Sequence, residues 1–260
     1  MTGFSVVIPA RFASTRLPGK PLADIVGMPM IARVAAEAAR SAAERVVVAT
    51  DDRRVLSALS SGAASRSVEG AMTASDHASG SDRTMEVAER EGWADDHVVV
   101  NVQGDEPLIP PAVIDQVAGL LHADASRDVA TLSEPLQTLE DVFDENVVKV
   151  VVSRGGRALY FSRAPVPFAR GRFDGRQGPL PSDAGGWRRH VGIYAYRVRA
   201  LRRFVALPRG TFEATESLEQ LRFLENDIDI VVADAVAPVP GGVDTPADLA
   251  RVRAVLGDSA

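Results

Sequence analysis

Short apolar runs alternate with polar loops along the first half of the chain. Residues 4–8, 45–50 and 97–102 are almost continuously apolar and rich in valine, and residues 68–72 fit a shorter strand. Runs of this length and β-branched content are typical of strands buried on both faces of a parallel sheet. We expect the first strand to end at Pro9, because proline cannot donate a hydrogen bond to a neighbouring strand.

The segments between these runs have helical features. Apolar spacing and first-turn prolines predict helices over residues 29–43, 53–60, 84–90 and 110–122, the second with Gly62 as its C-cap. A strand followed by a helix, repeated, is the pattern of right-handed βαβ units. The first half therefore predicts an α/β fold with a Rossmann-like, mostly parallel sheet flanked by helices.

The pattern of apolar and polar residues changes at about residue 128. Short strands are predicted over residues 129–132, 147–152, 157–162 and 190–196, with a loop rich in glycine and proline over 171–186. Helices over 199–205 and 214–225, a strand over 228–233 and a last helix over 246–256, capped by Thr245, complete the chain. We interpret residues 1–260 as a single domain. Within it, residues 128–200 form a smaller, more antiparallel lobe that we expect to be the surface of a homodimer.

Composition excludes several classes of function. The chain has 260 residues and a net charge of −6, so a broad surface for nucleic acid is not expected. It has no cysteine, which excludes disulfides, thiolate catalysis and cysteine-based zinc sites. Neither a run long enough to span a membrane nor a signal peptide is present in the sequence, so we expect a cytoplasmic protein that binds no membrane.

A basic loop follows the first strand. It carries Arg11, Arg16 and Lys20 among glycine and proline, with no carboxylate before Asp24. Loops at the carboxyl end of a parallel strand bind ligands in open α/β sheets, and this set of cations suits a polyanion such as a phosphate chain. The loop matches neither G-x-x-x-x-G-K-[ST] nor G-x-G-x-x-G, so P-loop and dinucleotide sites are not supported. A basic surface loop is the alternative.

Two aspartates occupy positions suited to a metal ion. Asp105 lies in Q-G-D-E-P at the end of a hydrophobic strand, and Asp244 lies in G-G-V-D-T-P just before the last helix. Mg²⁺ prefers hard oxygen ligands and is often held by one or two carboxylates together with phosphate oxygens. Each aspartate also fits an ordinary turn or helix start, so the metal site depends on their lying close together.

Other polar positions are less specific. In the loop over residues 72–83, small hydroxyl side chains, one glycine and one arginine could hold a nucleobase, whereas His77 alone favours a structural role. Arg163 with His190 would suit a substrate carboxylate. Each later polar residue also fits a surface or strand-edge position, and the sequence does not bring them together.

Several motifs occur in order along nearly the whole chain. They are I-P-A-R-F-A-S-T-R-L-P-G-K-P-L, M-T-A-S-D-H-A-S-G-S-D-R, V-N-V-Q-G-D-E-P, A-L-Y-F-S-R-A-P-V-P, R-H-V-G-I-Y-A-Y-R, L-E-Q-L-R and G-V-D-T-P-A-D-L-A-R-V-R. Together they resemble sugar nucleotidyltransferases of the cytidylyltransferase type, and most of all those that act on 3-deoxy-manno-octulosonate (Kdo). The family's nucleotide-diphospho-sugar transferase fold agrees with the predicted sheet.

The resemblance implies an activity and a site. CTP and Kdo would react to give CMP-Kdo and pyrophosphate for lipopolysaccharide biosynthesis, with Mg²⁺ as cofactor. By the resemblance, the catalytic residues are Arg11, Lys20 and Asp105, and the metal ligands are Asp105 and Asp244. The nucleotide-binding residues are Ala10, Arg11, Lys20, Thr73, Ser79, Gly80 and Arg83. The sugar-binding residues are Gln103, Arg163, His190, Tyr194, Glu219 and Gln220.

The sequence departs from the family pattern in the nucleotide loop. Ser81 stands where threonine is usual, and Ala74 and Ser75 stand where larger or charged residues are frequent. Because residue 81 keeps a hydroxyl group, we expect little change there. A related sugar acid, such as 8-amino-Kdo or a sialic acid, remains an alternative substrate. A nucleotide-binding regulatory protein without turnover is the alternative outside enzymes.

Overall fold

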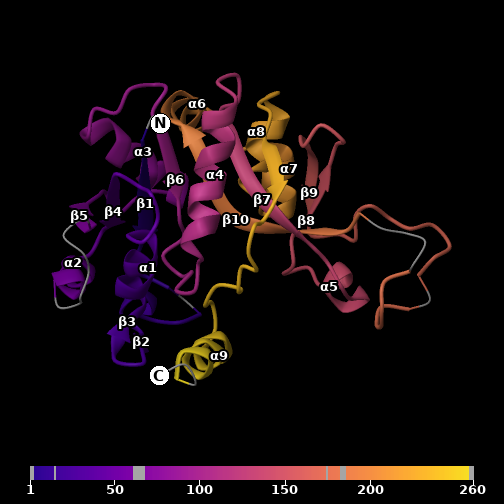
Figure 1. Ribbon diagram of the computed structural model, residues 1–260, viewed down its shortest axis with the longest axis horizontal. Coiled ribbons are helices and arrows are strands. Elements are labelled where there is room, and N and C mark those ends of the chain that lie inside the picture. Colours follow the sequence, from indigo (N-terminus) through magenta and orange to yellow (C-terminus); the bar gives the residue numbers. More distant parts are fainter. Residues whose placement is uncertain (1–2, 15, 61–67, 174, 182–185, 258–260) are drawn as a thin grey trace.

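The computed structural model describes residues 3–14, 16–60, 68–173, 175–181 and 186–257 (Figure 1). One mixed sheet organises this part of the chain, in the order β11-β7-β10-β6-β1-β4-β5. Its parallel part comprises β1 (Phe4–Ala10), β4 (Arg45–Thr50), β5 (Val68–Met72) and β6 (Val98–Asn101). The apolar runs therefore form the strands that were predicted, with β1 between β4 and β6.

The prediction that Pro9 ends the first strand is wrong. Strand β1 continues to Ala10, and Pro9 lies opposite Ala49 of β4. The carbonyl of Val7 accepts a hydrogen bond from the N–H of Val102, on the side of β6. Backbone groups two residues apart point to the same side, so Pro9 faces the region beyond the end of β6. Its missing N–H therefore costs the ladder no hydrogen bond.

Within the main sheet, every antiparallel pair includes a strand that follows residue 128. Strand β10 (Arg188–Arg197) runs antiparallel to β6, to β7 (Val129–Pro135) and to β8 (Lys149–Val152), and β8 pairs in turn with β9 (Ala158–Ser162). Strand β11 (Val231–Asp234) is parallel to β7. The fold class is confirmed: a mostly parallel sheet flanked by helices carries a small antiparallel extension. The division into a lobe and its role in a dimer stay predictions.

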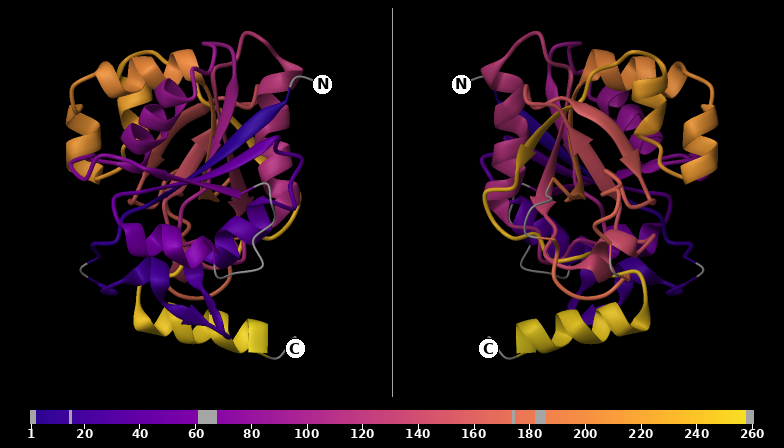
Figure 2. Two further views of the ribbon diagram at one scale, coloured as in Figure 1. Left: turned by 90° about the vertical axis from the view of Figure 1, so that its left-hand side faces the viewer. Right: turned by 90° about the vertical axis from the view of Figure 1, so that its right-hand side faces the viewer.

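Helices cover both faces of the sheet (Figures 1 and 2). Alternate residues along β1 point to opposite faces, as the period of a strand requires. Val6 and Ile8 pack with α1 (Met30–Ala38), α2 (Arg53–Ser60) and α4 (Pro111–Ala123). Val7 packs with α3 (Gly80–Arg90), α6 (Val198–Ala206) and α8 (Leu221–Glu225). Two apolar layers thus hold the central strands.

Several element boundaries differ from the prediction. Helix α1 ends at Ala38 rather than at residue 43, because the Ser41 hydroxyl donates to the Ala38 carbonyl at 2.6 Å and a tighter turn follows. The predicted helix over 214–225 is two helices, α7 (Thr211–Glu216) and α8, since Ser217 has the left-handed φ of 52°. The short helix α5 (Leu139–Phe143) was not predicted. Thr15 and the expected C-cap Gly62 lie outside the described residues.

The last helix, α9 (Pro246–Gly257), packs away from the main sheet (Figure 1). Its Leu249 and Val252 join Ile25, from the small hairpin of β2 (Asp24–Ile25) and β3 (Met28–Pro29), in a separate apolar cluster. The Thr245 hydroxyl accepts from the N–H of Asp248 at 3.2 Å, which confirms the predicted cap. Among the described helices, none combines the length and the apolarity that crossing a bilayer requires.

Candidate active site

A cavity of about 460 Å³ opens at the carboxyl ends of β1 and β6. It is bounded by the basic loop, by the loop that enters α3 and by the segment that precedes α9. Nine of the predicted site residues line it: Ala10, Arg11, Lys20, Ser79, Gly80, Arg83, Gln103, Asp105 and Asp244. Segments far apart in the sequence therefore converge at the edge of the sheet where α/β folds bind ligands.

Glycine at position 104 permits the close approach of two strand ends. A Cβ atom on Gly104 would lie 2.8 Å from the carbonyl oxygen of Pro9, closer than real Cβ atoms come to backbone. Gly80 is nearly as tight, because its Cβ would lie 3.1 Å from Cγ of Pro9. The base of the cavity is thus fixed by backbone contact rather than by flexible side chains.

A lysine joins the two aspartates. The Lys20 Nζ atom lies 2.5 Å from Oδ2 of Asp105 and 2.8 Å from Oδ1 of Asp244. Burial alone would lower the pKa of Lys20, but the charge and hydrogen bond of Asp105, together with those of Asp244, raise it overall. Arg16 reaches the same aspartate, with its Nη2 atom 3.1 Å from Oδ2 of Asp244. The two carboxylates therefore converge on one cationic position.

The backbone sets up this convergence. The N–H of Val243 donates to the carbonyl of Asp105 at 2.9 Å, which ties the segment before α9 to the end of β6. No group of three or more histidine, cysteine, aspartate or glutamate side chains suited to a metal ion occurs among the described residues. Asp105 and Asp244 are thus the two carboxylates that meet at Lys20.

The N-terminus of α3 faces the cavity. Ser79 caps this helix by accepting from the N–H of Asp82, and the Asp82 carboxylate accepts from the N–H of Ser79 at 2.9 Å. Ser79 and Gly80 both line the cavity. The positive end of a helix dipole favours an anion, so this wall suits a phosphate or another negatively charged group.

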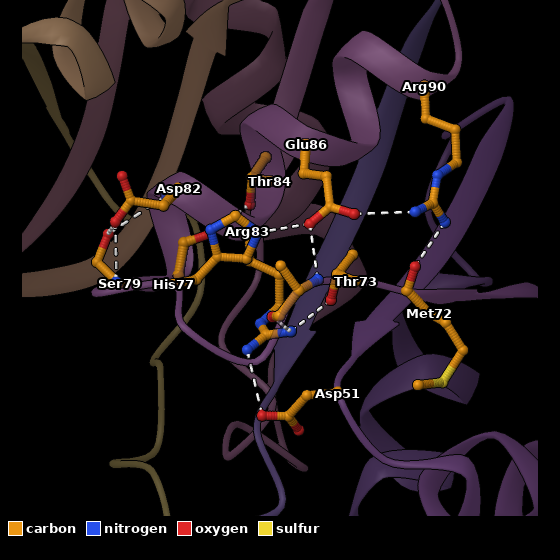
Figure 3. Close-up of polar contacts among 12 residues, drawn as sticks. Asp51, Met72, Thr73, His77, Ser79, Asp82, Arg83, Thr84, Glu86 and Arg90 are labelled. Carbon is orange, nitrogen blue, oxygen red and sulfur yellow. Dashed lines mark hydrogen bonds and ion pairs between the residues drawn. The ribbon is translucent and has the colours of Figure 1, made fainter.

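Hydrogen bonds from Arg83 hold the loop before α3 in place (Figure 3). Buried Arg83 donates to the hydroxyl of Thr73, to the carbonyl of Ala74 at 3.1 Å, and to Oδ2 of Asp51 at 3.5 Å. Thr73 is itself buried and is not among the residues that line the cavity. In this structure Arg83 anchors the loop and also contributes to the wall, whereas Thr73 supports that arginine.

His77 is part of the same anchoring network (Figure 3). Its Nε2 atom lies 2.5 Å from Oε2 of Glu86, and the same carboxylate oxygen accepts from the N–H of Ala74 at 2.9 Å. The histidine therefore holds the loop to α3, which agrees with the structural role that the sequence favoured, and it also lines the cavity.

A second group of polar side chains continues from the cavity along the sheet. Gln103 lines the cavity and donates from Nε2 to Oδ1 of buried Asn101 at 3.1 Å. Asn101 lies opposite Tyr194 in the pairing of β6 with β10. The rings of Tyr194 and His190 are 5.3 Å apart. Asn101 thus links Gln103 to the strand pair that carries Tyr194 and His190, and these four residues are called the polar path below.

His190 is held in its neutral form. Burial, reinforced by the charge of Arg189, lowers the pKa of His190 to about 3. Its Nε2 atom lies 3.0 Å from the hydroxyl oxygen of Thr131, and its ring meets that of Phe161 edge-on at 5.0 Å. The nearby Tyr194 hydroxyl is buried, with no hydrogen-bond partner among the described residues. Such a group favours a polar ligand.

Glu219 and Arg163 make their contacts with residues outside this path. The Ser81 hydroxyl donates to Oε1 of Glu219 at 2.5 Å, at the start of α3. Burial raises the pKa of Glu219, although the bond from Ser81 opposes the rise. Arg163 donates to the carbonyls of Glu216 at 2.7 Å and of Glu145 at 2.8 Å.

Apart from Gln103, the residues assigned to sugar binding do not line the cavity. Gln220 is buried at the residue that precedes α8. None of Arg163, His190, Tyr194, Glu219 and Gln220 is among the residues that line the cavity described above. Their assignment to a sugar pocket stays a prediction.

Three residues that the structure places in or beside the site were not among the predicted site residues. Asn101 links Gln103 to the paired strand, and its signal was a polar residue at the end of an apolar run. Asp51 accepts from both Arg83 and the N–H of Phe12, at the end of β4. Arg16 was noted as part of a basic loop, but its contact with Asp244 depends on the fold.

Comparison with known proteins identifies the family. The sequence profile described as Cytidylyltransferase matches residues 5–230. The chain belongs to the cytidylyltransferase family. It is therefore a nucleotidyltransferase, and family membership favours an enzyme over a regulatory protein that only binds nucleotide.

Individual relatives are more specific. The protein named 3-deoxy-manno-octulosonate cytidylyltransferase from Cellvibrio japonicus is 54% identical over 253 residues, which cover 97% of this chain and 98% of that protein. The protein of the same name from Aeromonas salmonicida is also 54% identical, over 97% of this chain and 98% of that protein. Both relatives match essentially from end to end.

A solved structure agrees with these relatives. The structure of CMP:2-keto-3-deoxy-manno-octonic acid synthetase complexed with CTP superposes with a TM-score of 0.87 at 40% identity. The match covers 99% of this chain and 100% of that one. The α/β architecture of this cytidylyltransferase is thus that of an enzyme that was solved with CTP.

Proposed function

We propose that this cytidylyltransferase transfers CMP from CTP to the anomeric hydroxyl group of Kdo, which gives CMP-Kdo and pyrophosphate. The observation that carries the proposal is the convergence of Lys20, Asp105 and Asp244 in a cavity beside the N-terminus of α3. The end-to-end identity with relatives that are named for this reaction supports the choice of both substrates. The product would supply activated Kdo for lipopolysaccharide biosynthesis.

Mg²⁺ fits the two aspartates. Their oxygens already surround a cation, the Lys20 ammonium, and carboxylates are the ligands that Mg²⁺ prefers in nucleotide sites. We therefore assign Asp105 and Asp244 as its protein ligands. When bound, Mg²⁺ would neutralise negative charge on the phosphate oxygens of CTP.

The side chains of this chain would position the phosphates. Arg11 and Lys20 supply positive charge to the cavity, and the N-terminus of α3 supplies backbone N–H groups and the positive end of a dipole. The sugar hydroxyl then attacks the α-phosphorus, and its proton passes to solvent water as the new P–O bond forms. The bond to the leaving pyrophosphate breaks, and pyrophosphate takes that electron pair. Fixed charges and orientation supply most of such catalysis.

The polar path along β6 and β10 is the proposed sugar pocket. Gly192 lies between His190 and Tyr194 in the sequence, and a Cβ atom on it would meet nothing within 4 Å, so there is open space beside this residue. The unpartnered Tyr194 hydroxyl and neutral His190 would hydrogen-bond to sugar hydroxyls. Glu219, Gln220 and Arg163 would close the pocket, with Arg163 facing the sugar carboxylate. The homodimer and the cytoplasmic location stay predictions.

Product analysis tests this proposal. The purified protein is incubated with CTP, Kdo and Mg²⁺, and ³¹P NMR follows the nucleotide. We expect the triphosphate signals to be replaced by a phosphodiester signal of CMP-Kdo and by pyrophosphate in equal amounts. Release of phosphate without a sugar phosphodiester would mean that the chain hydrolyses CTP and does not transfer CMP.

A further inference from the structure

Lys20 is one of very few lysines in a chain whose basic residues are almost all arginine. Of its 29 lysines and arginines, 27 are arginine, and the two lysines are Lys20 and Lys149. Lys149 is fully buried and donates to the carbonyl of Asp144 at 2.7 Å, far in sequence from the cavity. The other described cations that line the cavity, Arg11, Arg16 and Arg83, are arginines. A lysine thus occupies the one position in that wall where two carboxylates converge.

The type of cation matters at this position. An ammonium group is a compact point charge, whereas a guanidinium group is a planar fork that pairs side-on with a carboxylate. The Lys20 Nζ atom fits between Asp105 and Asp244, at 2.5 and 2.8 Å, much as a small metal ion would. Its side chain is only 14% exposed, so water screens these contacts less than at the surface.

We propose that Lys20 is a positioning residue that occupies the metal position until the nucleotide arrives. The ammonium group and a divalent cation cannot share the same carboxylate oxygens, because two positive charges at such a distance repel. Lys20 must therefore leave as the metal ion enters. This inference rests on the proposed function, since the phosphates of CTP provide the anion to which the ammonium group moves.

The exchange couples the two ligands. Without nucleotide, a metal ion that displaced Lys20 would force its ammonium group to exchange the two carboxylates for water. This cost makes the free protein bind metal weakly. With CTP, the displaced ammonium group gains phosphate oxygens, so the same metal position becomes available. Such coupling is reciprocal, and it would keep the free enzyme from holding a divalent ion without substrate.

A purely structural role of Lys20 is the competing explanation for the same contacts. Lys20 would then only fasten the end of β6 to the segment before α9. The hydrogen bond from Val243 N–H to the Asp105 carbonyl already makes that connection through the backbone. The two explanations differ in one measurable quantity, which is the metal affinity of the protein without nucleotide.

Electron paramagnetic resonance with Mn²⁺ as the probe measures that affinity, since bound Mn²⁺ loses the free-ion signal. We compare the wild type with Lys20→Met, which keeps the length of the side chain and removes its charge. We expect Lys20→Met to bind Mn²⁺ without nucleotide more tightly by on the order of tenfold or more. The double variant Lys20→Met, Asp105→Asn should lose this gain, because one ligand is removed.

Arg16→Met is the matched control. Arg16 also contacts Asp244, at 3.1 Å, but its side chain is 65% exposed. Solvent screening weakens such a pair, so we expect a change in Mn²⁺ affinity of less than about threefold. Equal gains in Arg16→Met and Lys20→Met would mean that any nearby positive charge opposes the metal, which would overturn a specific role of Lys20.

The outcomes separate this inference from the proposed function. Lys20→Gln serves as a second uncharged variant, and both variants must first show the wild-type circular dichroism spectrum. If neither then binds Mn²⁺ more tightly than the wild type, the inference is wrong. CTP binding and Kdo-dependent turnover by the wild type would still support the proposed function in that case. If the wild type neither binds CTP nor turns it over, the proposed function itself fails.

Discussion

His190 should make the free energy of unfolding sensitive to acid. Its pKa is about 3 in the folded protein, because burial and then Arg189 disfavour the charged ring, against 6.5 for an ordinary histidine. Below pH 6.5 the unfolded chain therefore binds a proton at this position that the folded protein does not bind. Stability that is complete above pH 6.5 is lost as the pH falls toward 3.

The size of the effect follows from the gap in pKa. Each pH unit below 6.5 removes about 1.4 kcal/mol, so at pH 5 the loss from this residue is at most about 2 kcal/mol. We choose His190→Gln as the perturbation, because glutamine does not titrate and can keep a hydrogen bond to Thr131. The variant also loses the edge-on contact with Phe161, which lowers stability by an amount independent of pH.

Urea unfolding followed by circular dichroism measures both proteins at several values between pH 7.5 and pH 5. We expect the wild type to lose about 2 kcal/mol more than His190→Gln over this range. The comparison uses the change with pH, so the constant packing term cancels. Parallel curves would refute the reasoning, because they would mean that His190 takes up its proton equally well in the folded protein.

Three further predictions concern the site. Gly104→Ala should lower the free energy of unfolding by about 1–3 kcal/mol, because its Cβ atom would meet the Pro9 carbonyl. The control Gly119→Ala has open space around it and should stabilise α4 by up to about 1 kcal/mol. Equal effects of the two substitutions in urea unfolding would contradict the packing argument. Asp105→Ala should abolish metal-dependent turnover while the circular dichroism spectrum stays unchanged, and near-normal turnover would remove Asp105 from the site. Arg163→Ala should raise the KM for the sugar by on the order of tenfold and leave that for CTP nearly unchanged, so equal rises in steady-state assays would place this arginine outside a sugar pocket.

The sequence predicted the strands well because burial on both faces leaves continuous apolar runs. Its errors have local causes that depend on the fold. Whether Pro9 can remain in a strand depends on where β6 ends, and no residue near Pro9 encodes that. The break at Ser217 is a left-handed turn at a residue type that is also found within helices.

Nine of the predicted site residues line one cavity, but the sequence alone did not predict how they lie relative to one another. Asp105 and Arg11 fall at strand ends, which the sequence shows, but their proximity requires β1 and β6 to be neighbours. Asp244 reaches them because Val243 bonds to the Asp105 carbonyl and α9 packs on the β2–β3 hairpin, and both contacts are far apart in sequence. The contact of Lys20 with both aspartates was not foreseen, since the motif suggested that lysine and aspartates would each bind part of the ligand.

The most direct test of the central claim is pyrophosphate release by the purified protein with Mg²⁺ and each of the four nucleoside triphosphates. Each reaction is run without sugar, with Kdo, with 8-amino-Kdo and with a sialic acid. We predict release that requires both CTP and Kdo. Release with CTP and only another sugar acid would keep the cytidylyltransferase activity and contradict the proposed sugar. Absence of release with CTP and every sugar acid would contradict the account of the site as a whole.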